Sequence, residues 1–595
     1  MRMNDRNVLQ AILEGHGSNQ RELSRTTELS LGAVNNSIKA LMSEGYINDS
    51  HLPTPKATKA KKNGTVKNAV ILAAGQGLRL LPINRDIPKG LIKIGNEPLI
   101  ERLICQLHSV GVTDITIVLG YMMERYEYLE DKYGVNLIVN NDYEQYNNLY
   151  SLRCVEQLLG NTYIVPCDLY FQENPFHFFE LDSWYMAQRQ EEIGTTLRVL
   201  RSGEIEVVDA TEKGNVIVGL SYLSQATAIE ARKNLLALTA QNKNGNEYWE
   251  AIITSGKRMI IEARYAKSGD AFHVNTYEDL RQLDFANEQL ENDATITIQK
   301  CFGVTLKDID DFLPLKNGLT NRSLRFTVNG QKYIIRIPGE GTENYINRVR
   351  EGKIYEMLRG KGICTDLTYF DAVKGFKITP YIDNVRPCDE TNPEDVRRCM
   401  TIARKFHDLK LSLGGEPLDI FNTIQHFEDL WEGKESGFAD YNETKKHCMA
   451  MKKYVEKHHR EAVLSHQDCT PDNFILYPDG KGGEKAEFID WECGCDADPL
   501  LDVASFVSYR KNDRNYIEMA IDAYFPEGCL DEDRLLIYCY ISLWGLYISV
   551  WCEYKKMLGE RIGQYMLTAY YYAKTYYRIF ESEYKRIFRK PYDES

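Results

Sequence analysis

A short polar loop near residue 470 carries the residue types that phosphoryl transfer requires. The segment Leu464 to Phe474 reads LSHQDCTPDNF, so Asp468 lies two residues after His466 and Asn473 lies five after Asp468. An apolar strand then ends in Asp490. A carboxylate can orient and deprotonate a hydroxyl, while an amide oxygen and a second carboxylate can hold Mg²⁺ on nucleotide phosphates. The spacing predicts a phosphotransferase site and leaves the acceptor hydroxyl open.

A second loop, near residue 75, has the features of a triphosphate-binding turn. The segment AVILAAGQGLRLLP places Gly75 and Gly77 directly after an apolar strand. Glycines remove side chains where the strand turns into a helix, so backbone N–H groups can approach a triphosphate. Arg79 and Lys89 would add positive charge against the phosphates. The chain therefore carries two candidate nucleotide sites.

Length and composition limit the class of protein. A chain of 595 residues is too long for one core and predicts about three to five domains. The net charge of -14 argues against wholesale wrapping of nucleic acid or binding to an anionic membrane surface. The fourteen cysteines are scattered and form no C-x-x-C pair, which is typical of a reducing compartment. The N-terminus has no apolar signal core, so we expect a cytoplasmic protein.

One apolar run is close to the length of a membrane span. Residues 535–551 read LLIYCYISLWGLYISVW, without a charged residue. The run contains three tyrosines, two serines, a cysteine and a glycine, and it is flanked by DEDR and EYKK. We interpret it as a helix buried inside a large domain, and we expect no membrane insertion.

The first 67 residues differ from the rest in charge and pattern. Residues 1–50 predict three short helices, and the segments SLGAV and GYI within them resemble the winged helix-turn-helix of bacterial regulators. Residues 1–67 contain ten Lys or Arg and six Asp or Glu, which is compatible with DNA as a partner. Several of these charges fall in PTPKATKAKKNG, so residues 51–67 are predicted to be a solvated linker.

Two further domains follow from the order of strands and helices. Residues 68–292 alternate apolar strands with helical segments, which predicts a Rossmann-like parallel sheet with its site at the carboxyl ends of the strands. Residues 293–595 begin with antiparallel strands joined by a turn at Asn329 and Gly330, and continue mostly as helices. The predicted fold class is multidomain α/β: a winged helix, a Rossmann-like α/β domain and a bilobal protein-kinase-like α+β domain.

The glycine loop near residue 75 belongs to a longer pattern that resembles sugar-phosphate and choline-phosphate nucleotidyltransferases. The resemblance covers most of residues 68–285 and points to the phosphocholine cytidylyltransferase branch, which transfers CMP from CTP to phosphocholine and releases pyrophosphate. It implies that Arg79 and Lys89 are catalytic and that Mg²⁺ is required. The matching residues include Ala73, Ala74, Gly75, Gly77, Arg79, Pro82, Pro88 and Lys89, then Val118 to Tyr121, Tyr146 to Ser151 and Tyr248 to Glu250. Of these, Ala74, Gly75 and Gly77 would bind the nucleotide.

The same resemblance identifies a metal ligand and an acceptor site. Asp168, which ends the strand YIVPCD, matches the family's metal-binding aspartate, but Asn275 stands where a second carboxylate is expected. The departure weakens the predicted metal site. Tyr222, Tyr248 and Trp249 are candidate aromatic faces for a trimethylammonium group. Relatives that act on phosphonates leave 2-aminoethylphosphonate open as an acceptor.

The loop HQDCTPDN resembles the catalytic loop of choline kinases and aminoglycoside phosphotransferases. The resemblance implies that Asp468 is the base, that Asn473 and Asp490 bind Mg²⁺ on ATP, and that His466 supports the loop. In the same comparison Gly318 and Thr320 of NGLTN would cover the phosphates. Arg336 would take the place of the strand lysine of protein kinases and pair with Glu351.

An aromatic stripe favours choline over an aminoglycoside. Trp544, Tyr547 and Trp551 are spaced i, i+3 and i+7 and share one helix face. A quaternary ammonium is recognised by aromatic faces, whereas aminoglycoside amines need several acidic groups. The segment Trp-Gly-Leu-aromatic also resembles the one that lines the choline pocket of choline kinases.

Together the two sites predict consecutive reactions. A kinase that makes phosphocholine and a transferase that converts phosphocholine to CDP-choline would use ATP and CTP in turn. Two alternatives stay open: the same chemistries on ethanolamine or an aminophosphonate, and a choline-sensing regulator that binds DNA through residues 1–67.

Overall fold

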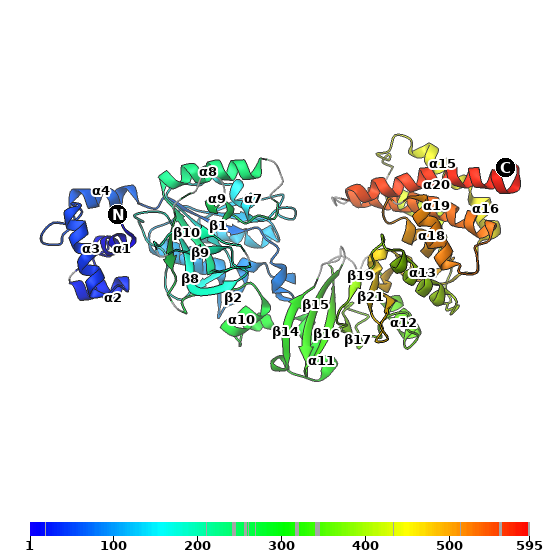
Figure 1. The fold of residues 1–595 in the computed structure, drawn as a ribbon, viewed down its shortest axis with the longest axis horizontal. Helices are drawn as coiled ribbons and strands as arrows, with labels where there is room; N and C mark the ends of the chain where they lie inside the picture. The colour runs from blue at the N-terminus through cyan, green and yellow to red at the C-terminus, as the bar shows by residue number, and fades with distance from the viewer. Residues whose placement is uncertain are drawn as a thin grey trace. The chain divides into compact units, whose positions relative to one another are not determined.

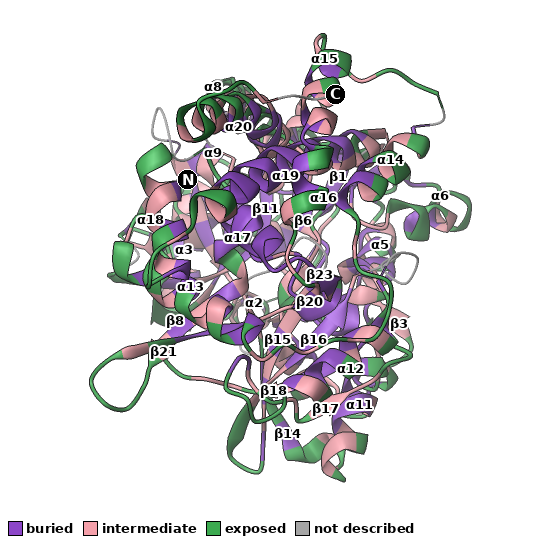
Figure 2. Ribbon diagram, turned by 90° about the vertical axis from the view of Figure 1, so that its right-hand side faces the viewer, coloured by how far each residue is buried: buried purple, intermediate pink, exposed green. Residues whose placement is uncertain are grey.

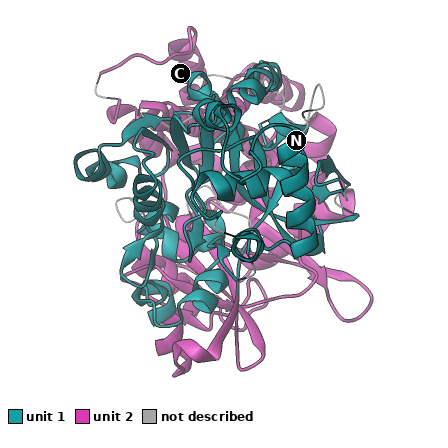
Figure 3. Ribbon diagram, turned by 90° about the vertical axis from the view of Figure 1, so that its left-hand side faces the viewer, with its two compact units in different colours: residues 1–296, 312–314 teal, residues 297–311, 315–595 magenta. Residues whose placement is uncertain are grey.

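The computed structural model describes two compact units. It covers residues 1–17, 19–200, 202–209, 211–240, 245–254, 259, 261–267, 269–315, 321–339, 346–431, 433–511, 513–557 and 562–592. Unit 1 comprises residues 1–296 with 312–314, and unit 2 comprises residues 297–311 with 315–595 (Figure 3). Each unit is considered by itself.

Unit 1 begins with a small helical bundle (Figure 1). Asn19 and Ser30 cap the second and third helices by accepting backbone N–H bonds, and an isolated bridge between Ile47 and Pro53 forms a short wing. The helices are α1 (Met3–Leu13), α2 (Gln20–Thr27), α3 (Leu31–Ser43) and α4 (Pro55–Asn63).

The segment predicted to be a linker differs from that prediction. Residues 55–63 form α4, with Pro55 in its first turn and Ala57 fully buried in the core of the bundle. A helix of two turns can dock through one apolar side chain, so α4 needs no amphipathic pattern in its sequence. Its many lysines therefore give it the composition of a linker. Residues 51–67 are therefore largely an ordered part of unit 1.

The bundle is attached to the rest of unit 1 through polar contacts of α1. Arg6 forms ion pairs with Asp182 and Glu262, and the Glu14 carboxylate lies 2.7 Å from Nδ1 of His177. The winged-helix region and the following α/β region are therefore in direct contact.

The α/β region contains a seven-stranded sheet in the order β12-β8-β11-β6-β1-β4-β5. The pairs β1/β4, β1/β6 and β4/β5 are parallel, and β11 is antiparallel to β6 and β8. Its strands are β1 (Asn68–Ala73), β4 (Ile115–Leu119), β5 (Asn136–Val139), β6 (Thr162–Pro166), β8 (Trp184–Ile193), β11 (Lys213–Leu223) and β12 (Glu262–Tyr265). Shorter strands pair as β2 (Lys93–Ile94) with β3 (Glu97–Pro98), β7 (Leu169–Phe171) with β13 (Ala271–His273), and β9 (Leu197–Val199) with β10 (Ile205–Val207).

Helices bury both faces of this sheet. Ala69 and Ile71 of β1 belong to one apolar cluster, while Val70 and Leu72 belong to the cluster on the other face. This division explains why β1 is apolar throughout instead of alternating. The helices are α5 (Leu99–Ser109), α6 (Tyr128–Tyr133), α7 (Asn148–Arg153), α8 (Gln225–Thr239), α9 (Ala251–Thr254) and α10 (Tyr277–Leu283).

The second part of the chain has a five-stranded sheet in the order β14-β15-β16-β18-β17. The predicted hairpin turn at Asn329 and Gly330 is present, and both residues have positive φ, as a type I′ turn requires. The strands are β14 (Ile309–Pro314), β15 (Asn321–Val328), β16 (Gln331–Pro338), β17 (Tyr369–Phe370) and β18 (Lys377–Pro380). Small pairings involve β19 (Arg386–Pro387), β20 (Val463–Ser465), β21 (Phe474–Pro478), β22 (Glu484–Phe488) and β23 (Cys495–Ala497).

Helices make up most of the remainder. They are α11 (Asp293–Phe302), α12 (Arg348–Leu358), α13 (Pro393–His407), α14 (Ile420–Asp429), α15 (Tyr441–Ala450), α16 (Lys452–His458), α17 (Leu500–Val507), α18 (Arg514–Tyr524), α19 (Asp531–Met557) and α20 (Gln564–Phe588). Strands followed by a helical lobe form the predicted kinase-like domain, and the predicted fold class is confirmed.

The apolar run predicted to be a buried helix lies in α19. Within the described residues, α19 is the helix whose length and composition could also cross a membrane, but 83% of its most apolar window is buried inside the structure. It packs against α14, α17 and α20, and Figure 2 shows most of it as buried. These contacts are typical of the core helix of a folded domain.

Candidate functional site

The first glycine loop follows β1 directly. Gly77 has a φ of 66°, a left-handed conformation that glycine adopts without strain. A Cβ at Gly75 would meet no atom within 4 Å, so the backbone there is open to a ligand. Ala74 is buried beneath the loop, and Arg79 is exposed.

Lys89 connects the loop to Asp168. Its Nζ lies 2.5 Å from Asp168 Oδ2 and donates a hydrogen bond of 2.7 Å to Asn275 Oδ1, which also accepts from Arg79 at 3.3 Å. His273 Nδ1 lies 3.6 Å from the same Asp168 oxygen. Burial alone would raise the pKa of Asp168, but Lys89 and His273 outweigh it and hold that pKa well below its usual range. The low pKa favours the ionised carboxylate, which Lys89 already compensates.

The predicted acceptor residues lie in different environments. Tyr248 is exposed, whereas Trp249 and Tyr222 are fully buried, and the Tyr222 hydroxyl donates to the Gly64 carbonyl. Glu250 accepts a hydrogen bond of 3.1 Å from Tyr185, while its other oxygen is buried without a hydrogen-bond partner among the described residues. Burial raises the pKa of Glu250 to about 7. The roles of these residues stay predictions.

In unit 2, buried backbone bonds hold the catalytic-type loop. The Asp502 carboxylate accepts from the backbone N–H groups of His466 and Gln467, at 2.7 and 2.8 Å. The His466 ring stacks on Phe488, and its Nε2 lies 2.9 Å from the Ile489 carbonyl. His466 thus lies beneath the loop, where the sequence predicted a supporting role.

Asp468 and Asn473 are hydrogen-bonded to each other. Asn473 Nδ2 donates to both the carbonyl and the carboxylate of Asp468, each at 2.7 Å, which leaves the Asn473 amide oxygen as an acceptor. Burial raises the pKa of Asp468 to about 7; the hydrogen bond from Asn473 opposes this shift, and Asp490 and other nearby carboxylates add to it. A carboxyl group with a pKa near neutrality is suited to accept a proton from a hydroxyl.

An ionic network joins the sheet, α12 and the end of β22. Arg336 forms ion pairs with Glu351 and Asp490, so the predicted Arg336–Glu351 pair is present. Glu492 lies 3.5 Å from Arg336 and accepts a hydrogen bond of 2.9 Å from Asn321. Gly318 and Thr320 lie outside the described residues, so their predicted contact with phosphates stays a prediction.

The aromatic stripe of α19 is only partly buried. Trp544 is 5% exposed and packs edge-on against Tyr547, with 5.2 Å between ring centroids. Burial raises the pKa of Tyr547, and Cys493 and Asp468 raise it further. Tyr565 is affected similarly, with Asp468 as the largest contribution after burial. The charge of Asp468 therefore acts on both tyrosines, whereas Trp551 lies near Lys555.

Within the residues that the structure describes, neither region contains a complete metal cage. No group of three or more His, Cys, Asp or Glu side chains among the described residues is arranged to hold a metal ion. In unit 2, Asp490 and the Asn473 amide oxygen are hard oxygen donors that fit Mg²⁺ shared with nucleotide phosphates. In unit 1, Asp168 fits such a role, but the Asn275 oxygen already accepts from two cationic side chains.

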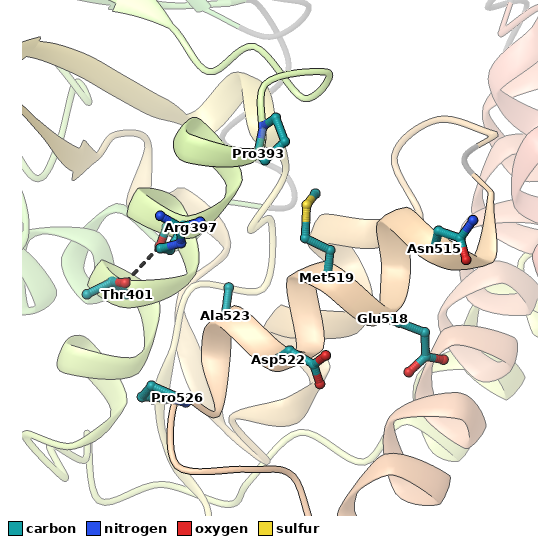
Figure 4. A pocket seen from close by; sticks show the side chains of 9 residues that line it. All are labelled: Pro393, Arg397, Thr401, Asn515, Glu518, Met519, Asp522, Ala523 and Pro526. Atoms are coloured by element: carbon teal, nitrogen blue, oxygen red, sulfur yellow. Dashed lines mark hydrogen bonds between the residues drawn. The ribbon is translucent and has the colours of Figure 1, made fainter.

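A separate hollow of about 590 Å³ lies between α13 and α18 (Figure 4). Met519 and Ala523 line it together with Arg397 and Asp522. None of its nine lining residues belongs to the loops described above.

Family models match three stretches of the chain. They are winged helix-turn-helix DNA-binding at residues 1–48, the MobA-like NTP transferase domain at residues 69–177, and choline/ethanolamine kinase at residues 312–526. A choline-phosphate cytidylyltransferase of Streptococcus pneumoniae is 30% identical over 220 residues, which are 36% of this chain and 96% of that protein. The chain belongs to the choline-phosphate cytidylyltransferase family. The predicted order of winged helix, nucleotidyltransferase and choline kinase-like domain is confirmed.

Two further proteins resemble this cytidylyltransferase-family chain. A 2-aminoethylphosphonate cytidylyltransferase of Lancefieldella rimae is 30% identical over 207 residues, 32% of this chain and 81% of that protein. The crystal structure of choline kinase LicA from Streptococcus pneumoniae is 24% identical, covers 48% of this chain and all of that chain, and has a TM-score of 0.41.

Sequence reasoning missed several residues of the two sites. His273 lies near Asp168 and two residues before Asn275. Lys377, opposite Arg336 on the neighbouring strand, and Tyr565, on which the charge of Asp468 acts, come from segments without a recognisable motif. Asp502 could have been suspected from the acidic segment DADPLLD, which follows Asp490 closely.

Proposed function

We propose that the chain phosphorylates choline with ATP and then transfers CMP from CTP to phosphocholine, giving CDP-choline and pyrophosphate. The observation that supports the kinase step is the setting of Asp468, a buried carboxyl group with a pKa near 7 that accepts a hydrogen bond from Asn473 and whose charge acts on Tyr547 of α19 and Tyr565 of α20. The cytidylyltransferase step is supported by the arrangement of Lys89, Asp168 and the open glycine loop.

In the kinase step, the oxygen of the choline hydroxyl attacks the terminal phosphorus of ATP and its proton passes to Asp468. The bond between the terminal phosphorus and the β-phosphate oxygen breaks, so that phosphocholine forms and ADP leaves. Tyr547 and Tyr565 present aromatic faces to the trimethylammonium group. Asn473 and Asp490 would hold Mg²⁺, which neutralises the ATP phosphates.

In the cytidylyltransferase step, a phosphate oxygen of phosphocholine attacks the α-phosphorus of CTP, and the bond to pyrophosphate breaks. The backbone at Gly75 and Gly77 contacts the phosphates, and Arg79 and Lys89 offset the charge of two anions. Asp168 would hold Mg²⁺ with phosphate oxygens as the other ligands.

The test uses the full-length protein with choline, ATP, CTP and Mg²⁺, followed by mass spectrometry. We expect CDP-choline, and phosphocholine alone when CTP is omitted. Asp468→Ala should stop phosphocholine formation but retain CDP-choline formation from added phosphocholine. Asp479→Asn, an exposed carboxylate on the neighbouring hairpin, is the matched control. Coupled loss of both activities in Asp468→Ala would contradict two independent sites.

A second candidate acceptor is an amine-bearing relative of choline. The kinase model includes ethanolamine kinases, and one relative acts on 2-aminoethylphosphonate. Consumption of ATP with ethanolamine but not with choline would favour this candidate and refute the aromatic-pocket argument.

DNA binding by the first region is a further candidate. Residues 1–48 match a DNA-binding family model, and Gly32, Asn36 and Lys39 are exposed on α3. Binding that weakens steeply as salt rises, and that changes when choline is added, would support a choline-sensing regulator in the cytoplasm.

A further inference from the structure

A buried lysine lies directly opposite Arg336 in the sheet of unit 2. Lys377 begins β18 and is the cross-strand partner of Arg336 on β16. The two side chains therefore project from the same face, and Lys377 is only 8% exposed. Two cations side by side in a buried place are costly unless carboxylates compensate them.

The compensation is shared unequally between the two cations. Arg336 forms close ion pairs with Glu351 and Asp490. Lys377 Nζ lies 3.7 Å from Glu351 Oε1 and 3.9 Å from Asp490 Oδ1, beyond hydrogen-bond distance. Within the described residues, its hydrogen bond is to the Tyr355 hydroxyl, at 2.6 Å. Lys377 therefore supplies charge to both carboxylates without occupying their oxygens.

Lys377 contributes to the charge balance of this network. Among the described residues, its cations are Arg336, Arg348 and Lys377, and its carboxylates are Glu351, Asp490 and Glu492. These described groups carry three positive and three negative charges. Loss of Lys377 would leave one buried negative charge where nucleotide phosphates, themselves anionic, must bind.

We propose that Lys377 is a positioning residue of the ATP site, whose ammonium holds Glu351 and Asp490 in place and offsets their charge as a nucleotide binds. Tyr355 fixes that ammonium from α12. The inference rests on the proposed kinase function, and the sequence motifs of that function do not include either residue.

The test compares Lys377→Met, Lys377→Arg and Tyr355→Phe in the full-length protein. Lys377→Met should weaken ADP binding, measured by calorimetry, and raise the KM for ATP by about tenfold or more, with the KM for choline within about twofold of wild type. Lys377→Arg should restore most of the affinity, and Tyr355→Phe should shift ADP binding in the same direction by a smaller factor. Lys332→Met removes a charge from an exposed position on β16 and is the matched control.

Cytidylyltransferase activity with added phosphocholine reports whether each variant chain is intact. Unchanged ADP binding in Lys377→Met would overturn the inference, and so would equal impairment of Lys377→Met and Lys377→Arg, because packing rather than charge would then matter. If Lys377→Met fails to fold, unchanged ADP binding in Tyr355→Phe would overturn it. A wild-type protein without ATP-dependent choline phosphorylation would instead refute the proposed function.

Discussion

Gly545 lies where α19 packs closely against the backbone of α20, next to Trp544 of the predicted acceptor pocket. A Cβ added at Gly545 would lie 2.5 Å from the Ala569 carbonyl oxygen and 2.7 Å from the Ala573 backbone nitrogen. An ordinary C···O contact is about 3.3 Å or longer, so α20 would have to move by about 0.8 Å. The obstructing atoms belong to the backbone and cannot rotate away.

Two effects of Gly545→Ala oppose each other. Alanine is favoured over glycine in a helix by about 1 kcal/mol. Overpacking a core lowers the free energy of unfolding by about 1–3 kcal/mol. A clash with backbone atoms should cost an amount near the upper end of this range, because the backbone cannot rotate away. We therefore expect unit 2 to lose about 2 kcal/mol and its inactivation midpoint to fall by about 4 °C.

The assay follows the thermal inactivation of both activities in the same chain. Gly545→Ala should lower the inactivation midpoint of choline phosphorylation and raise the KM for choline, because Trp544 shifts with α19. The cytidylyltransferase midpoint should not change. Gly415→Ala is the control, since a Cβ there meets no atom within 4 Å. A kinase midpoint equal to or above that of wild type would show that helix propensity outweighs the clash and would refute the argument.

Three other outcomes follow from the geometry. Asp468→Asn should lower the kcat for choline phosphorylation by about 10²–10⁴-fold, measured as phosphocholine formed, because the proton acceptor is lost. Lys89→Met should abolish cytidylyltransferase activity but keep kinase activity, since it removes the ion pair between Lys89 and Asp168, which lies in unit 1. Although burial opposes both shifts, the hydrogen bond between Glu14 and His177 lowers the pKa of Glu14 and raises that of His177. The pair therefore contributes its full stabilisation to unit 1 between about pH 4.5 and 6.5. This contribution is lost as the pH rises through the raised pKa of His177. Glu14→Gln should lower the free energy of unfolding of unit 1 by about 1 kcal/mol at pH 5.5, seen as a lower unfolding temperature. At pH 8.5 the same substitution should have little effect on the unfolding temperature.

The sequence predicted the fold well where local pattern and tertiary environment agree. The run NAVILA is apolar because both of its faces are buried, so its interpretation as a central parallel strand holds. The turn at Asn329 and Gly330 needs positive φ, which this dipeptide adopts readily. The interpretation of α4 failed because a lysine-rich helix docked through Ala57 has the composition of a linker.

The sites were predictable only as far as motifs extend. Asp468, Asn473 and Asp490 share one short stretch of chain, so their spacing reveals them. Lys377 and Tyr565 reach the same region through tertiary contacts, and a single lysine or tyrosine carries no signal in a sequence. Trp249 is fully buried, and burial explains an aromatic residue as well as ligand binding does, so its predicted role stays a prediction.

Both nucleotide sites share one electrostatic arrangement. Each holds the carboxylate expected to bind Mg²⁺ in an ion pair with a cation, Asp168 with Lys89 and Asp490 with Arg336. Without such pairs, a buried carboxylate would lose its charge or destabilise the fold. On nucleotide binding, Lys89 and Arg336 would pair with phosphate oxygens, and Asp168 and Asp490 would hold Mg²⁺. The arrangement keeps each site charge-compensated before and after binding, so removing one partner should impair stability as well as activity, whereas removing both should impair activity alone.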